Sequence, residues 1–172
     1  MSGTVILSHG SDSGPDATKV SALAAVAEKL GWRTQRPDYR EEDALGYAGS
    51  VPQRVTRLIS AMQDAQRPLV LAGSSMGAFV SGLASLQTRC DALFLIALPV
   101  SIPRWSSPFD MARVPMMLVH GYHDRLCPPM AAAAFARARG MPMLMLPDDH
   151  RLAGHVEMIA AQFRLFLERL PA

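Results

Sequence analysis

The amino-acid sequence predicts an α/β protein, a three-layer sandwich around a mostly parallel sheet of about six strands. Short apolar runs alternate along the chain with longer segments of helical period. Most of these runs are apolar at successive positions, as in strands covered on both faces of a parallel sheet. The 172 residues, 49% of them hydrophobic, are enough to bury one core. The chain is therefore expected to form a single domain over residues 1–172.

Six apolar runs are expected to form the strands. They are Val5–Ser8, Arg33–Pro37, Leu69–Ala72, Ala92–Leu98, Pro115–His120 and Met141–Leu146. The run at 33–37 is the weakest of them. Because functional groups gather at the carboxyl ends of parallel strands, the loops that follow these runs are the expected place for a site.

Two helices are expected in the first half of the chain. Residues 16–30 place an apolar stripe on one side and end at Gly31, a stop signal. Residues 51–65 form a second such stripe, for which Ser50 is a suitable N-cap and Pro52 falls in the first turn.

Three further helices are expected after the third strand. The first contains Phe79, the second is the alanine-rich segment 129–139 that ends at Gly140, and the last covers about 154–170. Each follows a predicted strand, as in a chain of strand–helix units.

Composition and charge exclude several classes of protein. The formal net charge is +2, and the arginines are scattered, whereas a nucleic-acid-binding face needs a basic stripe. No run approaches the length of a membrane span, and no signal peptide is recognisable. Two cysteines fit a reducing compartment. The sequence thus predicts a cytoplasmic protein that binds neither nucleic acid nor membrane; it does not indicate an oligomeric state.

The sharpest local motif is Gly73-Ser74-Ser75-Met76-Gly77, which lies between a predicted strand and a predicted helix. This G-x-S-x-G pattern in a strand–turn–helix context is typical of a nucleophilic serine. The nucleophile must project from a tight turn, so its flanking residues must be small. The alternative is an ordinary glycine-serine turn between a strand and a helix.

A serine nucleophile needs a base, and the base needs an orienting acid. Asp124 follows the strand Pro115–His120, and His150 follows the strand Met141–Leu146. The order Ser75, Asp124, His150 is the one expected for this architecture. His155 falls at the start of the last helix and is not the expected base.

The loop after the first strand, Ser8-His9-Gly10-Ser11-Asp12, supplies a further element. The backbone N–H of Ser11 is expected to form an oxyanion hole with that of Met76. A phosphate-binding loop is the rival interpretation. It is disfavoured because Pro15 and Asp16 stand where that motif needs lysine and serine or threonine, and because Asp12 would repel a phosphate.

Other residues are interpreted more simply. His9, His120 and His123 lack metal-binding spacing, so neither a metal nor a cofactor is predicted. Cys127 has no motif around it and is expected to be a bystander. The run Glu41-Glu42-Asp43 is expected to be a solvated charged loop.

These motifs together resemble the α/β-hydrolase fold. The turns at His9-Gly10, Gly73–Gly77, His120-Gly121-x-x-Asp124 and Asp149-His150 are similar to those of its small lidless serine hydrolases, esterase-like relatives of the dienelactone hydrolases. The resemblance covers residues 4–168 and implies nucleophile Ser75, acid Asp124, base His150 and oxyanion donors Ser11 and Met76. The chain departs from the family pattern in two ways. It starts at the first parallel strand, and its Gly73–Gly77 turn carries serine where dienelactone hydrolases carry cysteine.

The segment 101–114 is too short to hold a helical cap. Its Trp105 and Phe109 are expected to roof a shallow substrate pocket. The predicted function is hydrolysis of a small carboxylic ester through an acyl-Ser75 intermediate, with a small-molecule acyl substrate as partner. The alternatives are a thioesterase or peptidase at the same residues, or a non-catalytic binding module.

Overall fold

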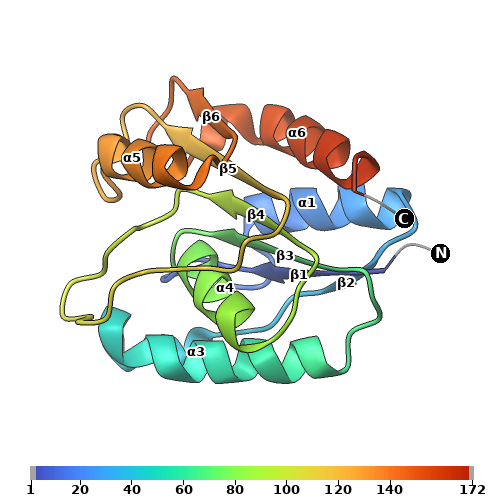
Figure 1. Cartoon of the computed structure of the whole chain (residues 1–172), viewed down its shortest axis with the longest axis horizontal. Coiled ribbons are helices and arrows are strands. Elements are labelled where there is room, and N and C mark those ends of the chain that lie inside the picture. Colours follow the sequence, from blue (N-terminus) through green and yellow to red (C-terminus); the bar gives the residue numbers. More distant parts are fainter. Residues whose placement is uncertain (1–2, 171–172) are drawn as a thin grey trace.

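The computed structural model describes residues 3–170 and has the predicted α/β architecture (Figure 1). All pairs of adjacent strands are parallel, in the order β2-β1-β3-β4-β5-β6. The strands are β1 (Thr4–Ser8), β2 (Arg33–Gln35), β3 (Leu69–Ser74), β4 (Ala92–Ile96), β5 (Met116–Gly121) and β6 (Met143–Leu146). The helices are α1 (Thr18–Lys29), α2 (Arg40–Asp43), α3 (Gly46–Gln63), α4 (Met76–Gln87), α5 (Pro129–Arg139), the short 3-10 helix η1 (Ala153–His155) and α6 (Val156–Glu168).

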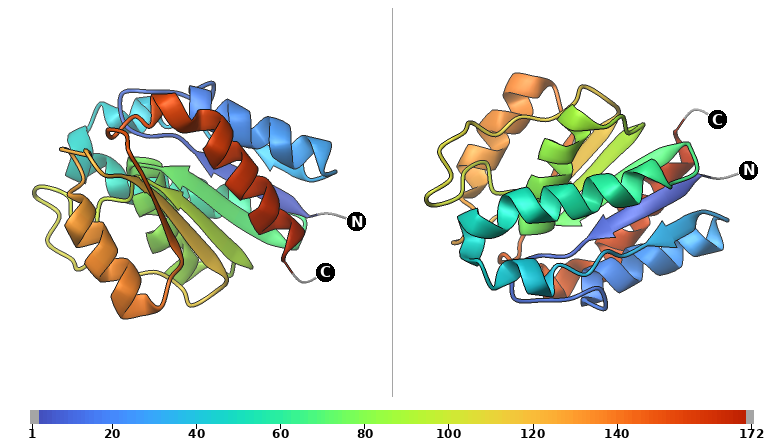
Figure 2. Two further views of the ribbon diagram at one scale, coloured as in Figure 1. Left: turned by 90° about the horizontal axis from the view of Figure 1, so that it is seen from above. Right: turned by 90° about the horizontal axis from the view of Figure 1, so that it is seen from below.

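Helices cover both faces of the sheet, which explains the unbroken apolar runs of the central strands (Figure 2). α1 and α6 pack on one face, where Val5, Leu7 and Phe94 point. α3, α4 and α5 pack on the other face against Ile6 and Leu71. Side chains of one strand alternate between the two cores, so the three layers are held together by apolar burial from both sides.

The helix expected over 51–65 begins five residues earlier, at Gly46. Ser50 is therefore not its N-cap but a buried position inside the helix, where its Oγ donates to the carbonyl of Tyr47 at 3.0 Å. Pro52 likewise lies inside the helix rather than in its first turn. The N-terminal extension is held by α2, which packs against α3, and this tertiary contact outweighs the local start signal.

The expectation of a solvated loop at Glu41-Glu42-Asp43 is wrong for two of the three residues. These residues lie in α2, and the Glu42 side chain is buried and accepts a hydrogen bond from Arg57 Nε at 2.5 Å. Asp43 pairs with Arg54, which is completely buried. Only Glu41 of the three is well exposed. The carboxylates of Glu42 and Asp43 thus attach α2 to arginines of α3, because a buried charge needs a partner.

The carboxyl ends of the central strands are aligned by their register. Ser8 of β1 pairs with Gly73 of β3, and Ile96 of β4 pairs with Val119 of β5. At the sheet's edge, Gly121 of β5 pairs with Leu146 of β6. The loops after β1, β3, β5 and β6 therefore meet at one edge of the sheet, and these loops carry all the chemistry-bearing residues predicted from the sequence.

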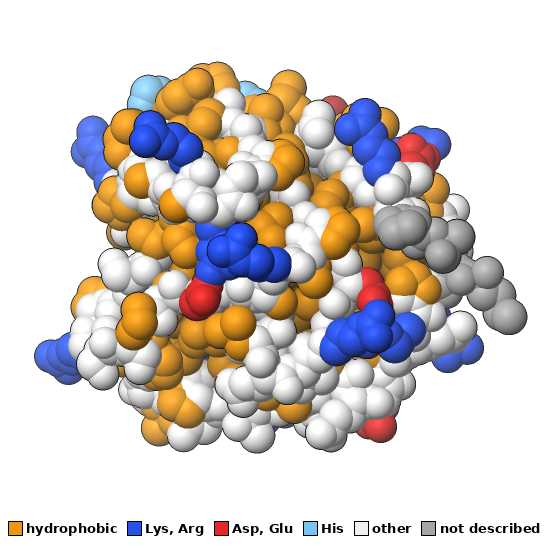
Figure 3. All heavy atoms as spheres, in the orientation of Figure 1, with side chains coloured by type: hydrophobic (Ala, Val, Ile, Leu, Met, Phe, Trp, Pro, Cys, Tyr) orange, Lys and Arg blue, Asp and Glu red, His pale blue; other side chains and the backbone are white. Residues whose placement is uncertain are grey.

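The face drawn in Figure 3 carries its lysine and arginine side chains as separate groups among hydrophobic and uncharged ones. Acidic side chains lie beside several of these groups. Within residues 3–170, no helix combines the length and hydrophobicity that crossing a bilayer requires.

Candidate active site

The turn between β3 and α4 is closely packed against the first strand. A Cβ on Gly73 would lie 2.3 Å from the carbonyl oxygen of Gly77, and one on Gly77 would lie 2.0 Å from the carbonyl oxygen of Ser8. Neither position can hold a side chain without moving the backbone. The two glycines of the motif thus let α4 leave the sheet abruptly and leave Ser75 at the tip of the turn.

Ser75 has φ 55° and ψ −119°, a backbone conformation that is uncommon for a residue with a side chain. Its N–H donates to the carbonyl of Ile96 at 2.8 Å, which ties the strained tip to the end of β4. Strain of this kind persists where the surrounding structure over-determines it, and it is concentrated at functional sites.

His150 stands between Ser75 and Asp124. Its Nε2 lies 3.0 Å from Ser75 Oγ, and its Nδ1 lies 2.8 Å from Asp124 Oδ2. The structure thus joins the three side chains predicted from separate motifs into one hydrogen-bonded chain. In the arrangement with Nδ1 protonated, His150 donates to Asp124 and its Nε2 accepts the hydroxyl proton of Ser75.

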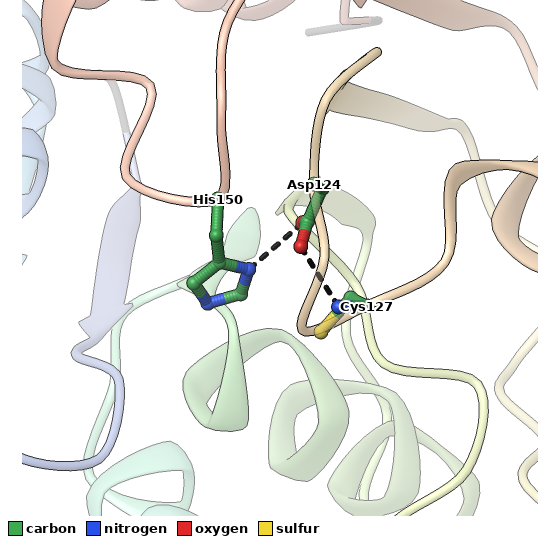
Figure 4. A group of neighbouring side chains, drawn as sticks. All are labelled: Asp124, Cys127 and His150. Atoms are coloured by element: carbon green, nitrogen blue, oxygen red, sulfur yellow. Dashed lines mark hydrogen bonds and ion pairs between the residues drawn. The ribbon is translucent and has the colours of Figure 1, made fainter.

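Asp124 is buried, and its carboxylate is hydrogen-bonded to His150 and to the backbone of Cys127 (Figure 4). Its Oδ1 accepts the backbone N–H groups of Leu126 and Cys127 at 2.9 and 2.8 Å. His120 Nε2 lies 3.3 Å from its Oδ2. Burial alone would raise the pKa of the Asp124 carboxyl, but the hydrogen bonds from His120, His150 and Cys127 outweigh burial and hold that pKa below its ordinary value. The carboxylate therefore stays ionised at neutral pH.

Cys127 also lies beside this pair, and donor atoms of Asp124, Cys127 and His150 all fall within 4.8 Å of one another (Figure 4). A metal would bind the thiolate form of cysteine. Burial raises the pKa of the Cys127 thiol to about 12, and the nearby Asp124 carboxylate adds to this effect. The thiol is thus protonated at neutral pH, and both carboxylate oxygens are already hydrogen-bonded. Asp124 and Cys127 are therefore better suited to orienting His150 than to binding a metal ion with it.

The loop after β1 lies against the tip of the Ser75 turn. A Cβ on Gly10 would lie 3.4 Å from Ser75 Cβ. His9 beneath this loop is completely buried: Tyr39 N donates to its Nε2 at 3.0 Å, and its Nδ1 donates to the carbonyl of Gly10 at 2.7 Å. Among residues 3–170, no acceptor is bound by the backbone N–H of Ser11 or of Met76. Both groups are free to bind a ligand oxygen.

Arg54 is the main support of this loop, and the sequence analysis did not single it out. Its Nη1 donates to the carbonyl of His9 at 2.9 Å, and its Nη2 donates to that of Gly10 at 3.2 Å. Asp43 holds the same guanidinium through Nε and Nη2 at 2.7 and 2.6 Å. In a trans peptide the C=O and the next N–H point in opposite directions. Fixing the Gly10 carbonyl therefore also fixes the direction of the Ser11 N–H.

Replacement of Arg54 by methionine is expected to lower the free energy of unfolding by about 3–5 kcal/mol, because Asp43 would lose its partner in a buried pair. Urea denaturation measures the change. Arg164→Met is the control, since Arg164 pairs with Glu168 on the surface of α6 and the two side chains are 63% and 40% exposed; its loss should stay within about 1 kcal/mol. Equal effects of the two substitutions would contradict the anchoring role of Arg54.

A cavity of about 480 Å³ opens beside Ser75 and His150. Small and polar residues dominate its lining, with Ser11, Ser13, Thr18 and Lys19 among them. A larger cavity of about 630 Å³ borders Arg113–Met117 near the start of β5 and contains none of the predicted site residues. The cavity beside Ser75 is the one that places a bound molecule near the nucleophile candidate.

The expectation that Trp105 and Phe109 roof the substrate pocket is wrong. Neither residue lines the cavity beside Ser75. Both rings pack on Phe79 of α4, with centroid separations of 6.2 Å for Trp105 and 4.8 Å for Phe109. Gly82 provides the space, because a Cβ there would lie 2.6 Å from Phe109 Cζ. The segment 101–114 therefore covers the apolar surface of α4, where burial of aromatic area is most favourable.

His155 lies outside the Ser75–His150–Asp124 chain. Its Nδ1 lies 2.8 Å from Asp148 Oδ2, and the same carboxylate oxygen accepts Gly154 N at 3.0 Å. His155 and Asp148 thus fasten the turn that leads from the His150 loop into α6.

Comparisons with known proteins agree with this architecture. Residues 1–158 match the family model described as an alpha/beta hydrolase domain. A structure from Xanthomonas campestris pv. campestris, assigned to the α/β hydrolase superfamily, is 42% identical, with a TM-score of 0.91 and coverage of 98% of this chain and 99% of that one. A search of curated protein sequences finds no match.

Two more distant structures share the fold. An alpha-beta serine hydrolase homologue from Coxiella burnetii is 21% identical, with a TM-score of 0.69 and coverage of 94% of this chain and 83% of that one. Est1E from Butyrivibrio proteoclasticus is 16% identical, with a TM-score of 0.80 and coverage of 98% and 88%. With the family model matching most of its length, this chain belongs to the α/β-hydrolase family and is a hydrolase.

Proposed function

We propose that the protein is a serine esterase that cleaves a small carboxylic ester through an acyl-Ser75 intermediate. The hydrogen-bonded chain from Ser75 Oγ through His150 to Asp124, at 3.0 and 2.8 Å, is the observation that carries this proposal. It has the geometry by which a base withdraws the hydroxyl proton as the oxygen attacks a carbonyl carbon.

In the proposed reaction His150 is first general base and then general acid. It accepts the Ser75 proton through Nε2 during attack and returns a proton to the leaving alcohol oxygen when the C–O bond breaks. Asp124 keeps the imidazole oriented and stabilises its cationic form. In the second half, His150 deprotonates a water molecule, which attacks the acyl-enzyme and releases the carboxylic acid and Ser75.

The negative charge that develops on the carbonyl oxygen needs donors in place before the reaction. The free N–H groups of Ser11 and Met76 are suited to this role. Met76 is also the first residue of α4, whose N-terminus carries partial positive charge. Arg54 contributes indirectly, since it orients the peptide that contains the Ser11 N–H.

Active-site labelling distinguishes an esterase from a binding module on the same fold. A fluorophosphonate probe reacts only with an activated serine. We expect stoichiometric labelling, mapped to Ser75 by peptide mass spectrometry, and its loss after prior incubation with an ester-like inhibitor. Absence of labelling on the folded protein, or labelling elsewhere, would contradict the proposal.

Short acyl chains are expected to be preferred. The cavity beside Ser75 is bounded by small and polar side chains, and the segment 101–114 packs on α4 instead of enclosing a channel. In a series of p-nitrophenyl esters, kcat/KM should peak at about two to four carbons, because Val20 and Val156 are the only apolar side chains larger than alanine among the described residues that line the cavity and could contact further methylenes. A maximum beyond about ten carbons would contradict the shape inferred for the cavity.

The same assay separates ester hydrolysis from the other reactions open to such a site. An aryl thioester and an aminoacyl amide with the same acyl group serve as comparisons. Higher kcat/KM for either than for the matched ester would replace the proposed esterase with a thioesterase or a peptidase.

A further inference from the structure

Lys19 is a charged residue in the cavity that the proposed mechanism does not use. It lies in the first turn of α1 and lines the same cavity as Ser75 and His150. The chain has only one other lysine, Lys29, at the far end of the same helix. Lys19 precedes the buried Leu23 by four residues and is half-buried, so its side chain lies at the border of the packed face of α1.

The positive charge of the Lys19 ammonium group has few compensating partners. Its Nζ donates to the carbonyl of Arg151 at 2.5 Å, and within residues 3–170 it forms no ion pair. Burial lowers the pKa of Lys19 below its ordinary value, an effect that the carboxylates of Asp148 and Asp149 partly offset. A partly buried cation with a single neutral acceptor retains donors for a ligand, because an ammonium has three N–H bonds to offer.

The N-terminus of α1 faces the same space. Ala17, Thr18 and Val20 line the cavity together with Lys19, and no side chain caps this helix. Uncapped N–H groups and the positive end of the helix dipole favour an anion. The hydroxyl of Ser11, which lines the same cavity, is buried and has no hydrogen-bond partner among the described residues. The cavity thus holds three kinds of unused donor.

The remaining charged groups of the cavity limit the ligand's charge. Asp12 and Arg151 are exposed and also contribute to its lining. Among the lining residues, Lys19 and Arg151 carry one more positive charge than the single Asp12 carboxylate, and the carboxylates of Asp148 and Asp149 act on Lys19 from outside the lining. A monoanion fits this balance better than a phosphate dianion, which these carboxylates would repel more strongly.

We infer that the ester hydrolysed here carries a carboxylate, which binds to Lys19 at the N-terminus of α1 while the ester carbonyl lies at Ser75. This inference rests on the proposed esterase function and adds the substrate class to it. A carboxylate held in this way would orient the ester for attack, since two anchored points fix the direction of a small molecule.

The test compares matched neutral and anionic esters. On the acyl side, mono-4-nitrophenyl adipate is compared with 4-nitrophenyl hexanoate; on the alcohol side, 4-carboxyphenyl butyrate is compared with its methyl ester. For at least one pair, we expect kcat/KM to favour the anion by about tenfold to a hundredfold, the range for a hydrogen bond to a charged group. No preference in either pair would overturn the inference, while hydrolysis of the neutral esters would still support an esterase.

The variants Lys19→Met and Lys29→Met locate the carboxylate. The ratio of anionic to neutral kcat/KM should fall to about one in Lys19→Met and persist in Lys29→Met, whose altered side chain starts about 15 Å along the helix. Lys19 also holds the Arg151 carbonyl next to His150. If it acts only as that support, both esters would lose rate together and the ratio would persist, which would overturn the inference.

A binding measurement makes the inference independent of turnover. Adipic acid monoamide and hexanamide differ mainly in the distal carboxylate, and titration calorimetry with Ser75→Ala compares them directly. We expect tighter binding of the carboxylate compound by about tenfold or more. Equal affinities, or a preference that survives in the Lys19→Met/Ser75→Ala double variant, would contradict the role of Lys19.

Discussion

Ser75→Ala is expected to reduce ester turnover by a factor on the order of 10⁶ while leaving the protein folded. The loss follows from removal of the only atom proposed to attack the carbonyl carbon. Folding should be preserved because, within residues 3–170, the Ser75 hydroxyl bonds only to His150 Nε2, and because the backbone bond from Ser75 N to the Ile96 carbonyl does not involve the side chain. Steady-state assays with p-nitrophenyl butyrate and a thermal melt measure the two quantities.

The adjacent Ser74 offers a matched control in the same turn. It is buried at the end of β3, and its side chain has no role in the proposed mechanism. Ser74→Ala should therefore keep activity within about tenfold of the wild type, as expected for a substitution outside the reacting group. If Ser75→Ala retained more than about a tenth of the wild-type rate, the nucleophile assignment would be wrong.

His150→Ala is expected to reduce turnover at least 10³-fold, on the order seen when a triad member is removed. The reason is the position of its ring between Ser75 Oγ and Asp124 Oδ2 at 3.0 and 2.8 Å. His155→Ala serves as the control, since His155 bonds to Asp148 and not to Ser75. Its activity should remain within about tenfold of wild type, although it should unfold at a lower urea concentration.

The double variant Ser75→Ala/His150→Ala tests whether the two residues act together. Members of one catalytic unit are strongly non-additive, so the double variant should be little worse than Ser75→Ala alone. A large loss in His155→Ala together with an active His150→Ala would transfer the base role to His155. Losses that multiply would show that Ser75 and His150 act in separate steps.

The fold class could be predicted from sequence because its signal is local and repeated. A strand covered on both faces must be apolar at successive positions, as β3 and β4 are, and a surface helix must repeat its apolar residues every three to four positions. Element ends were less predictable. α3 starts at Gly46 rather than at 51, because packing against α2 extends it past the local signals at Ser50 and Pro52.

The buried supports of the site were missed for a different reason. Arg54 and Asp43 are charged, and charged residues are expected at the protein surface when only the sequence is known. One feature of the sequence does indicate that Arg54 is buried. It lies on the apolar stripe of α3, four residues before Leu58. Lys19 has a similar signal, since it precedes Leu23 by four positions. Neither pattern identifies the backbone carbonyls that these side chains bind, because those carbonyls come from distant loops.

By itself, the sequence determined the fold class and the family, and it placed Ser75, Asp124 and His150 on three loops at one edge of the sheet. Motif spacing suffices for this, since parallel strands bring their carboxyl ends together whatever the details of packing. Only the tertiary structure decided that Trp105 and Phe109 pack on Phe79, and that Lys19 enters the cavity beside Ser75. Side-chain direction depends on which surfaces meet in three dimensions, and burial of the aromatic rings on α4 outweighs any contact they could make over an open site.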